Sequence, residues 1–175
     1  AGDFESARST LTGGIAADPR NYQLYQDMAL VDLRATGVEA ALVTAERLML
    51  QDRDFPAIHA LKGDVYMAAN RPLDATVSYS EAMKTHPSDL LANRLAGALV
   101  RARRTEDAVK VLADWSDKHP DDLPAKEQLG ELYIALNDIP NAGKYLEQIL
   151  VKKPYDPIAL NNLAWVYQQL GQNDK

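Results

Sequence analysis

The sequence contains no cysteine among its 175 residues, which excludes disulfide bonds, thiolate metal sites and a cysteine nucleophile. Aromatic residues make up only 7%, and no apolar run reaches the roughly 18 residues that a membrane-spanning helix needs. A basic excess is also missing, because 25 acidic residues outnumber 19 basic ones and the net charge is −6. We therefore expect no nucleic-acid partner and no direct membrane insertion of this segment.

Catalytic motifs are missing as well. The sequence has no H-E-x-x-H, no glycine-rich phosphate loop and no G-x-S-x-G. His86 and His119 each precede a proline. One interpretation of this spacing is a paired metal or base site. The favoured interpretation is that each histidine lies at a helix C-terminus, where its positive charge interacts favourably with the helix dipole. His59 is expected to be a packed imidazole. We therefore predict a protein that is not an enzyme and that uses no cofactor and no metal.

What the sequence does have is a regular spacing of proline. Pro19, Pro87, Pro120 and Pro154 occupy equivalent places, and Arg53 fills the slot between the first two. The successive separations are 34, 34, 33 and 34 residues. Proline ends a helix because it lacks an amide donor, and a period near 34 residues is typical of stacked helical hairpins.

Four copies of one pattern accompany these slots. Each copy has a small residue inside a first helix, a second small residue in the next helix, and the proline slot twelve residues after it. The clearest copy is Lys126-x2-Leu129-Gly130-x2-Tyr133, then Ala142-x3-Leu146, then Pro154. Small residues let two helices approach closely, and large ones at helical spacing fill the core. Over nearly its whole length the chain resembles the tetratricopeptide repeat family.

This resemblance implies an all-α fold, a right-handed superhelical solenoid of about ten antiparallel helices. We expect one solenoid with its repeats at 1–21 (half), 22–55, 56–88, 89–122, 123–156 and 157–175 (half). Since both ends are half repeats, we expect a piece of a longer array. The half repeats are also candidates for end-to-end self-association.

Several residues depart from the family pattern. Asp32 stands where an apolar residue is expected, and no glycine fills the usual turn slot after it, so we expect an irregular hairpin there. Lys62 replaces leucine and should keep its stem packed with its ammonium in water. Trp115 replaces a small residue of a second helix and should swell the convex face of its hairpin.

In this family the first helices of the hairpins line a concave groove that binds peptide or protein segments. The candidate partner-binding residues are Gln26, Leu30, Leu33, Arg34, Asp64, Met67, Asn93, Arg94, Arg101, Glu127, Glu131, Ile134, Asn161, Trp165 and Gln168. Trp165 has two open interpretations, a groove contact or a packing residue for a further helix. An exposed tryptophan in a groove is a residue type favoured at binding hot spots.

The arginines of the third full repeat raise a separate question. Chaperone-binding relatives hold a peptide carboxylate with a clamp of lysine, asparagine and arginine side chains. Only Arg94 matches a position of this clamp, so we reject that function. Arg94, Arg101, Arg103 and Arg104 form a basic stretch, which indicates either an anionic ligand or a solvated helix end, and we favour the latter.

Three features together resemble the tetratricopeptide lipoproteins of the bacterial PEP-CTERM/exosortase system, which accompany exopolysaccharide genes. They are the hairpin of Leu33–Ala35 followed by Glu39–Leu42 and the runs Leu61–Tyr66 and Leu160–Tyr167. The resemblance implies a scaffold in the periplasm or cell envelope of a Gram-negative bacterium, with the cytoplasm as the open alternative. We predict a non-catalytic scaffold that binds peptide or protein segments in its groove. The alternative is a structural spacer whose repeats stack on each other with little ligand binding.

Overall fold

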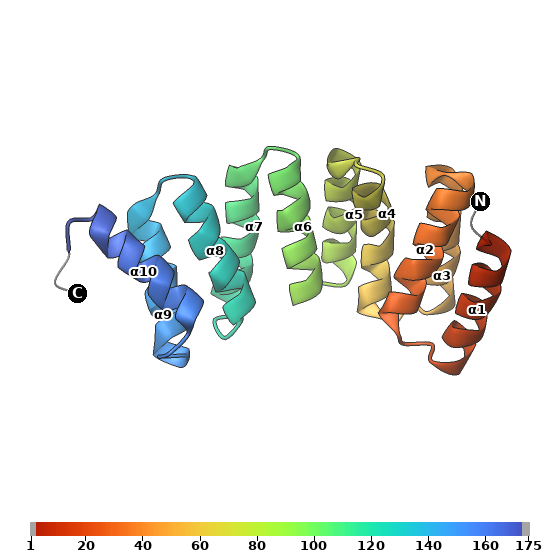
Figure 1. Ribbon diagram of the computed structural model, residues 1–175, viewed down its shortest axis with the longest axis horizontal. Helices are drawn as coiled ribbons and strands as arrows, with labels where there is room; N and C mark the ends of the chain where they lie inside the picture. Colours follow the sequence, from red (N-terminus) through yellow and green to blue (C-terminus); the bar gives the residue numbers. More distant parts are fainter. Residues whose placement is uncertain (1–2, 173–175) are drawn as a thin grey trace. The chain divides into compact units, whose positions relative to one another are not determined.

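The structure is a computed structural model that describes residues 3–172, apart from the side chain of Pro56. Within that range the chain forms ten α-helices and one 3-10 helix and contains no strand, so the predicted all-α class is confirmed. The helices are α1 (Phe4–Ala17), α2 (Tyr22–Thr36), α3 (Val38–Gln51), η1 (Pro56–Ala60), α4 (Leu61–Ala68), α5 (Pro72–Thr85), α6 (Asp89–Arg101), α7 (Thr105–Lys118), α8 (Leu123–Ala135), α9 (Ile139–Lys152) and α10 (Pro157–Gln169) (Figure 1). None of these helices is long and apolar enough to cross a bilayer.

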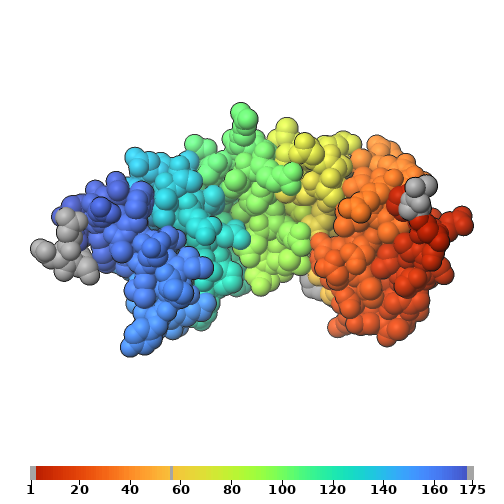
Figure 2. Space-filling view, in the orientation of Figure 1, coloured from red at the N-terminus to blue at the C-terminus, as the bar shows by residue number. Residues whose placement is uncertain are grey.

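The chain forms two compact units, Ala1–Ala102 and Arg103–Lys175, which we call the N-terminal and C-terminal units. The N-terminal unit carries α1 to α6 and the C-terminal unit carries α7 to α10. Within each unit, consecutive helices pack against each other. In the space-filling view α1 and α2, coloured red and orange, form one continuous surface (Figure 2). The expected single solenoid stays a prediction.

The second helix of each hairpin ends two residues before its proline slot. α5 ends at Thr85, His86 caps it, and Pro87 follows; α7 and α9 end in the same way. α3 ends at Gln51 although Arg53 replaces the proline. The helix can therefore stop at this position without a proline, because the following turn already redirects the chain.

The turns inside the hairpins share one backbone geometry. Asn70, Arg103, Asn137 and Gly171 have positive φ angles of 56°, 60°, 58° and 70°, each four residues after the last large residue of its first-helix pattern. In the first full hairpin α2 continues through Thr36, and the positive φ of 104° falls on Gly37 instead. The predicted irregularity of this hairpin is confirmed, and its cause is a turn displaced by one residue.

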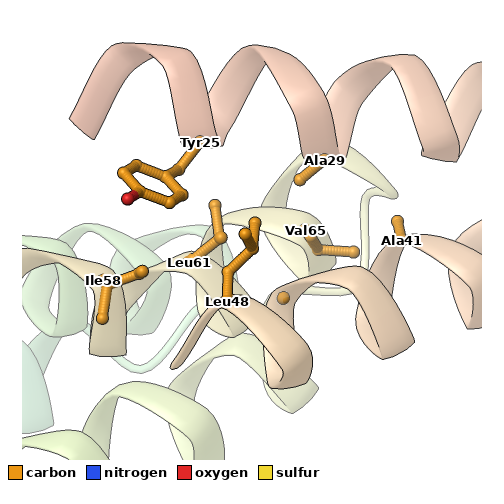
Figure 3. Close-up of a cluster of buried hydrophobic side chains, with 8 residues drawn as sticks. Tyr25, Ala29, Ala41, Leu48, Ile58, Leu61 and Val65 are labelled. Carbon is orange, nitrogen blue, oxygen red and sulfur yellow. The ribbon is translucent and has the colours of Figure 1, made fainter. Parts of the chain in front are cut away.

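The core of the N-terminal unit lies between first and second helices (Figure 3). Tyr25 of α2 points toward Leu61 of α4, and Leu48 of α3 and Ile58 of η1 close the same cluster. A second cluster in the C-terminal unit joins α9 and α10 around Ile149. Burial of these apolar side chains is the main source of stability for both units.

Two of the irregular residues form ion pairs. Asp32 is 2% exposed and pairs with Arg8 of α1, a partner that sequence reasoning did not identify. The Lys62 side chain is 32% exposed, as expected for a packed stem. Its ammonium lies 2.7 Å from Oε1 of Glu46, so it forms an ion pair where water was expected around it. The first turn of the Lys62 hairpin is the 3-10 helix η1.

Trp115 is buried against the end of its own helix. Its indole Nε1 donates a 2.6 Å hydrogen bond to Asp122, and its ring stacks on His119 at a centroid distance of 3.8 Å. Asp122 also caps α8 by accepting from the amide of Ala125. The expected swelling of the convex face stays a prediction.

Candidate functional site

A cavity of about 180 Å³ lies in the N-terminal unit, on the face formed by the first helices α2, α4 and α6. Six of the fifteen predicted partner-binding residues meet there: Gln26, Leu30, Leu33, Asp64, Met67 and Arg94. The remaining lining residues are Gln23, Ala29, Leu61, Val65 and Ala68. The helical spacing of each first helix brings these residues to one face, since residues three or four apart lie on the same side.

Asp64 is the centre of the polar side of this cavity. Its Oδ2 accepts hydrogen bonds from Tyr22 (2.6 Å) and Gln26 (2.5 Å), and its Oδ1 accepts from Tyr79 (2.5 Å) and from Nη1 of Arg94 (3.0 Å). The Asp64 side chain is 10% exposed. The carboxylate thus ties α2, α4, α5 and α6 together, and we call these five side chains the Asp64 network. A carboxylate that accepts several donors fixes their positions, because each bond is charge-assisted.

Both tyrosines of the network remain hydrogen-bond donors over the physiological pH range. Burial, followed by the negative charge of Asp64, raises the pKa of Tyr22 far above its ordinary value of 10.0. The same two causes raise the pKa of Tyr79. Their hydroxyl groups therefore stay protonated and keep donating to Asp64, the carboxylate that also accepts from Gln26 and Arg94.

The charge of Arg94 is balanced inside the network. Because its guanidinium pairs with Asp64, the cavity has no excess cation from this residue. Arg101 donates to the side chain of Asn70 at 3.1 Å, so it too is engaged locally. Arg103 and Arg104 lie at the start of α7, where Arg104 pairs with Asp107 at 2.9 Å. The solvated helix end therefore describes Arg101, Arg103 and Arg104 but not Arg94, which is paired with Asp64 in the middle of α6. The pairing of Arg94 disfavours an anion site at the cavity.

The other predicted residues lie outside the cavity lining. In the N-terminal unit, Arg34 is exposed in the last turn of α2. Asn93 of α6 carries a buried Oδ1 that has no hydrogen-bond partner among residues 3–172. The C-terminal unit holds the rest of the predicted set: Glu127, Glu131, Ile134, Asn161, Trp165 and Gln168.

Within the C-terminal unit these residues differ in their surroundings. Glu127 lies 3.5 Å from the ammonium of Lys153, and Ile134 packs against the buried cluster of α9 and α10. Glu131 is exposed, and Trp165 is 38% exposed on α10. The exposure of Trp165 is compatible with both of its open interpretations.

Tyr22 and Tyr79 were not predicted as site residues. Sequence reasoning treated Tyr79 as the large core residue of its second helix, which it also is, since it is 0% exposed. The sequence did contain a signal for this contact. The family pattern has phenylalanine at the position of Tyr79, and the hydroxyl group of a buried tyrosine needs a hydrogen-bond acceptor. The partner is Asp64, one residue after the small Gly63 that admits the ring.

The histidines do not form the paired site that was one interpretation of their spacing. His86 and His119 cap the C-termini of α5 and α7, as the favoured interpretation predicts. His86 stacks on His59 with centroids 3.6 Å apart, and His119 stacks on Trp115. Among the described residues no group of three or more His, Cys, Asp or Glu side chains is arranged to hold a metal ion.

The size of the cavity limits what it can hold. Pockets for small-molecule ligands measure about 300–1,000 Å³, so a cavity of about 180 Å³ is small for a metabolite. It suits one apolar side chain surrounded by Leu30, Leu33 and Met67. The exposed edge of Arg94, whose side chain is 38% exposed, can donate hydrogen bonds to a peptide carbonyl beside it.

The helical hairpins, their small residues at the helix crossings and the face of first helices define a class of repeat protein. Residues 1–65 and 66–129 match the model of the tetratricopeptide repeat, and the chain belongs to this family. Proteins of this family are typically non-catalytic scaffolds for protein–protein interaction.

Curated relatives are distant and longer. The chain is 27% identical over 154 residues to tetratricopeptide repeat protein 21B of Xenopus laevis, covering 87% of this chain and 12% of that protein. It is 24% identical over 145 residues to TPR repeat protein oca3 of Schizosaccharomyces pombe, covering 77% of this chain and 51% of that protein. The chain therefore spans about an eighth of the first relative and about half of the second.

Solved structures share the fold. The crystal structure of YrrB matches with a TM-score of 0.61 at 17% identity, covering 94% of this chain and 85% of that one. A crystal structure of MamA matches with a TM-score of 0.65 at 18% identity, covering 87% and 84%. At these identities the likeness shows the fold alone.

Proposed function

We propose that this protein is a scaffold that binds an extended peptide segment on the face of α2, α4 and α6, with one apolar side chain of the peptide in the cavity. The observation that carries the proposal is the cavity itself, in which a small apolar pocket adjoins the charge-balanced Asp64 network. A neutral rim favours an apolar anchor over an acidic one, because an acidic side chain would find the guanidinium of Arg94 already paired. The solved structure of YrrB, which shares the fold, is described as having an unusual peptide-binding site.

Peptide selection tests this proposal. A phage-displayed random peptide library is panned against the whole chain, and the affinity of each selected peptide is measured by calorimetry. We expect selected peptides to share one apolar position and to lose at least about tenfold in affinity on Met67→Glu, which places a carboxylate among the apolar lining residues. Val151→Glu in the C-terminal unit is the matched control, because Val151 is 78% exposed and outside the cavity.

The opposite outcome is equally informative. If no peptide is enriched, or if Met67→Glu and Val151→Glu affect the affinity alike, the cavity is not the binding site. The structural spacer would then be the better description.

The resemblance of Leu61–Tyr66 and Leu160–Tyr167 to the PEP-CTERM/exosortase lipoproteins supports a finer proposal. On this basis we propose that the parent protein acts in protein sorting or exopolysaccharide export at a bacterial cell envelope. Fractionation of cells that produce the full-length parent tests the location. Recovery of the protein in the cytoplasmic fraction would contradict it. End-to-end association through the half repeats is part of the same proposal, and light scattering at rising concentration tests it independently.

A further inference from the structure

A second surface of the N-terminal unit exposes apolar side chains on its second helices, away from the proposed peptide site. Val43 and Leu50 of α3 are each 65% exposed, and Leu73 and Val77 of α5 are 59% and 57% exposed. We call these four residues, together with a cavity that Leu50 lines, the α3–α5 surface. Val43 and Val77 occupy equivalent positions of successive repeats, 34 residues apart. An exposed valine that recurs at one repeat position favours an interaction surface over an isolated exposed residue.

In the following hairpin, the second helix α7 carries charged residues at the equivalent positions. On α7 the residues equivalent to Leu73 and Val77 are Glu106 and Lys110, both exposed. The repeat therefore accommodates charge at these positions, and packing within the repeat does not require the apolar residues of α3 and α5. Since exposed apolar side chains gain free energy when a partner covers them, the difference points to an interaction surface.

A cavity of about 470 Å³ lies between α3 and α5 on this surface. Met49 and Leu50 of α3 and Ala82 of α5 form its apolar part. Its volume falls within the range of about 300–1,000 Å³ found for ligand pockets, so it is large enough to receive a long side chain together with its flanking atoms.

The charged residues of this cavity leave one negative charge unbalanced. Lys62 of α4 pairs with Glu46 of α3 at 2.7 Å, and Glu81 of α5 is the second carboxylate in the lining. His59 of η1 also lines the cavity, and burial lowers its pKa, so its imidazole is neutral at neutral pH. Arg47 and Lys84 lie on the same two helices but outside the lining. A basic side chain entering the cavity would meet Glu81 and offset this charge.

We propose that the α3–α5 surface binds an amphipathic helical segment of a second protein, one that presents apolar residues around a single lysine or arginine. The apolar residues cover Val43, Leu50 and Val77, and the basic side chain enters the cavity toward Glu81. An amphipathic helix places apolar residues that are three or four positions apart against such a surface. Val43 and Leu50 are about 10 Å apart along the axis of α3, which equals about two turns of the bound helix.

Two synthetic peptides test the proposal. Both are helical peptides of about 18 residues with leucines at i, i+3, i+4 and i+7, and they differ only in carrying a lysine or a glutamate in the middle of the leucine face. The full chain is labelled for NMR, and affinities are measured by calorimetry. We expect the lysine peptide to shift the methyl signals of Val43, Leu50 and Val77, and to bind about tenfold more tightly than the glutamate peptide. Equal affinities, or shifts confined to other helices, overturn the proposal.

Variants of exposed residues add a second, independent readout. Val77→Lys introduces the residue type that α7 carries at the equivalent position, so the chain should fold, and it should weaken the lysine peptide by about tenfold. Glu81→Lys should reverse the preference between the two peptides. Val151→Lys in the C-terminal unit and Met67→Glu in the other cavity should leave both affinities unchanged. If Glu81→Lys does not reverse the preference, the assignment of the basic side chain to the cavity is wrong.

Discussion

The hydroxyl group of Tyr79 donates a 2.5 Å hydrogen bond to Oδ1 of Asp64, from a ring that lies directly on Gly63. A Cβ atom placed on Gly63 would lie 2.2 Å from Cε1 of Tyr79, closer than two carbon atoms can approach. The small residue at this helix crossing therefore does more than let two helices approach. It admits the ring whose hydroxyl supports the Asp64 network, and so links a packing position to the candidate site.

We expect Gly63→Ala to destabilise the N-terminal unit by about 1–3 kcal/mol, the usual cost of overpacking a buried position. The displaced ring should also weaken peptide binding at the α2–α4–α6 face. The control is Gly97→Ala in the middle of α6, where an added Cβ meets no atom within 4 Å. This control should gain about 0.5–1 kcal/mol from helix propensity. Urea unfolding of the three proteins gives the comparison, and a neutral Gly63→Ala would show that Tyr79 can move freely.

The Asp64 network should behave as a cooperative unit. Asp64→Asn removes the charge that Arg94 pairs with and leaves one side-chain oxygen to accept four donors. We expect a loss of about 2–3 kcal/mol in the free energy of unfolding, below the cost for a fully buried pair because Arg94 is partly exposed.

A double-mutant cycle with Arg94→Gln isolates the pair. If the network is coupled, the double variant should lose less than the sum of the two single losses. Additive losses would mean that Arg94 is a surface residue that happens to lie near Asp64.

Periodicity predicted most of the fold and part of the site. The proline slots and small residues determine helix ends and crossings, which depend on local sequence, and so the helices, turns and caps follow from them. The grouping of Gln26, Asp64 and Arg94 also follows, since each lies on the groove side of its helix. The periodicity did not predict side-chain contacts between residues that have no fixed separation in the sequence.

Three contacts illustrate this limit. Arg8 reaches Asp32 from a neighbouring helix, Tyr22 reaches Asp64 across 42 positions, and His59 stacks on His86. Each depends on the side-chain length and rotamer of one residue, and a repeat pattern does not encode either. The displaced turn at Gly37 has a different origin: glycine adopts a positive φ readily, and the turn falls on it instead of on the position that the period assigns.

The ion pair of Arg8 with Asp32 gives a further prediction. Arg8→Ala should leave a carboxylate that is 2% exposed without its cation, and it should cost about 1–2 kcal/mol. This is less than for a fully buried pair, because the side chain of Arg8 is 52% exposed and solvent screens it.

Asp32→Leu is the informative partner variant, since leucine is the residue type that the family pattern favours there. It removes the buried charge and should be neutral or stabilising. In that background Arg8→Ala should cost less than about 0.5 kcal/mol, the scatter of ordinary surface substitutions. Chemical denaturation of the four proteins measures this, and an undiminished cost of Arg8→Ala would show that Arg8 acts through contacts other than Asp32.

The lowered pKa of His59 leads to a prediction of how the free energy of unfolding depends on pH. Burial, opposed in part by the carbonyl of Arg53 and assisted by the neighbouring His86, lowers the pKa of His59 from its ordinary value of 6.5. The unfolded chain therefore binds a proton at a higher pH than the folded chain does, and the free energy of unfolding should fall as the pH drops through 6.5. Lys62, Glu46 and Glu81 also line the cavity that His59 lines, and His86 stacks on His59 from the end of α5.

Urea unfolding between about pH 7.5 and pH 5.5 tests this, in a window above the titration of ordinary carboxylates. His59→Gln should flatten the dependence, because glutamine does not titrate. His86→Gln should keep most of it, because burial is the larger cause of the shift and remains in that variant. If wild type and His59→Gln lose stability equally over this window, the imidazole of His59 is solvated in the folded chain, and the stack with His86 does not exclude water from it.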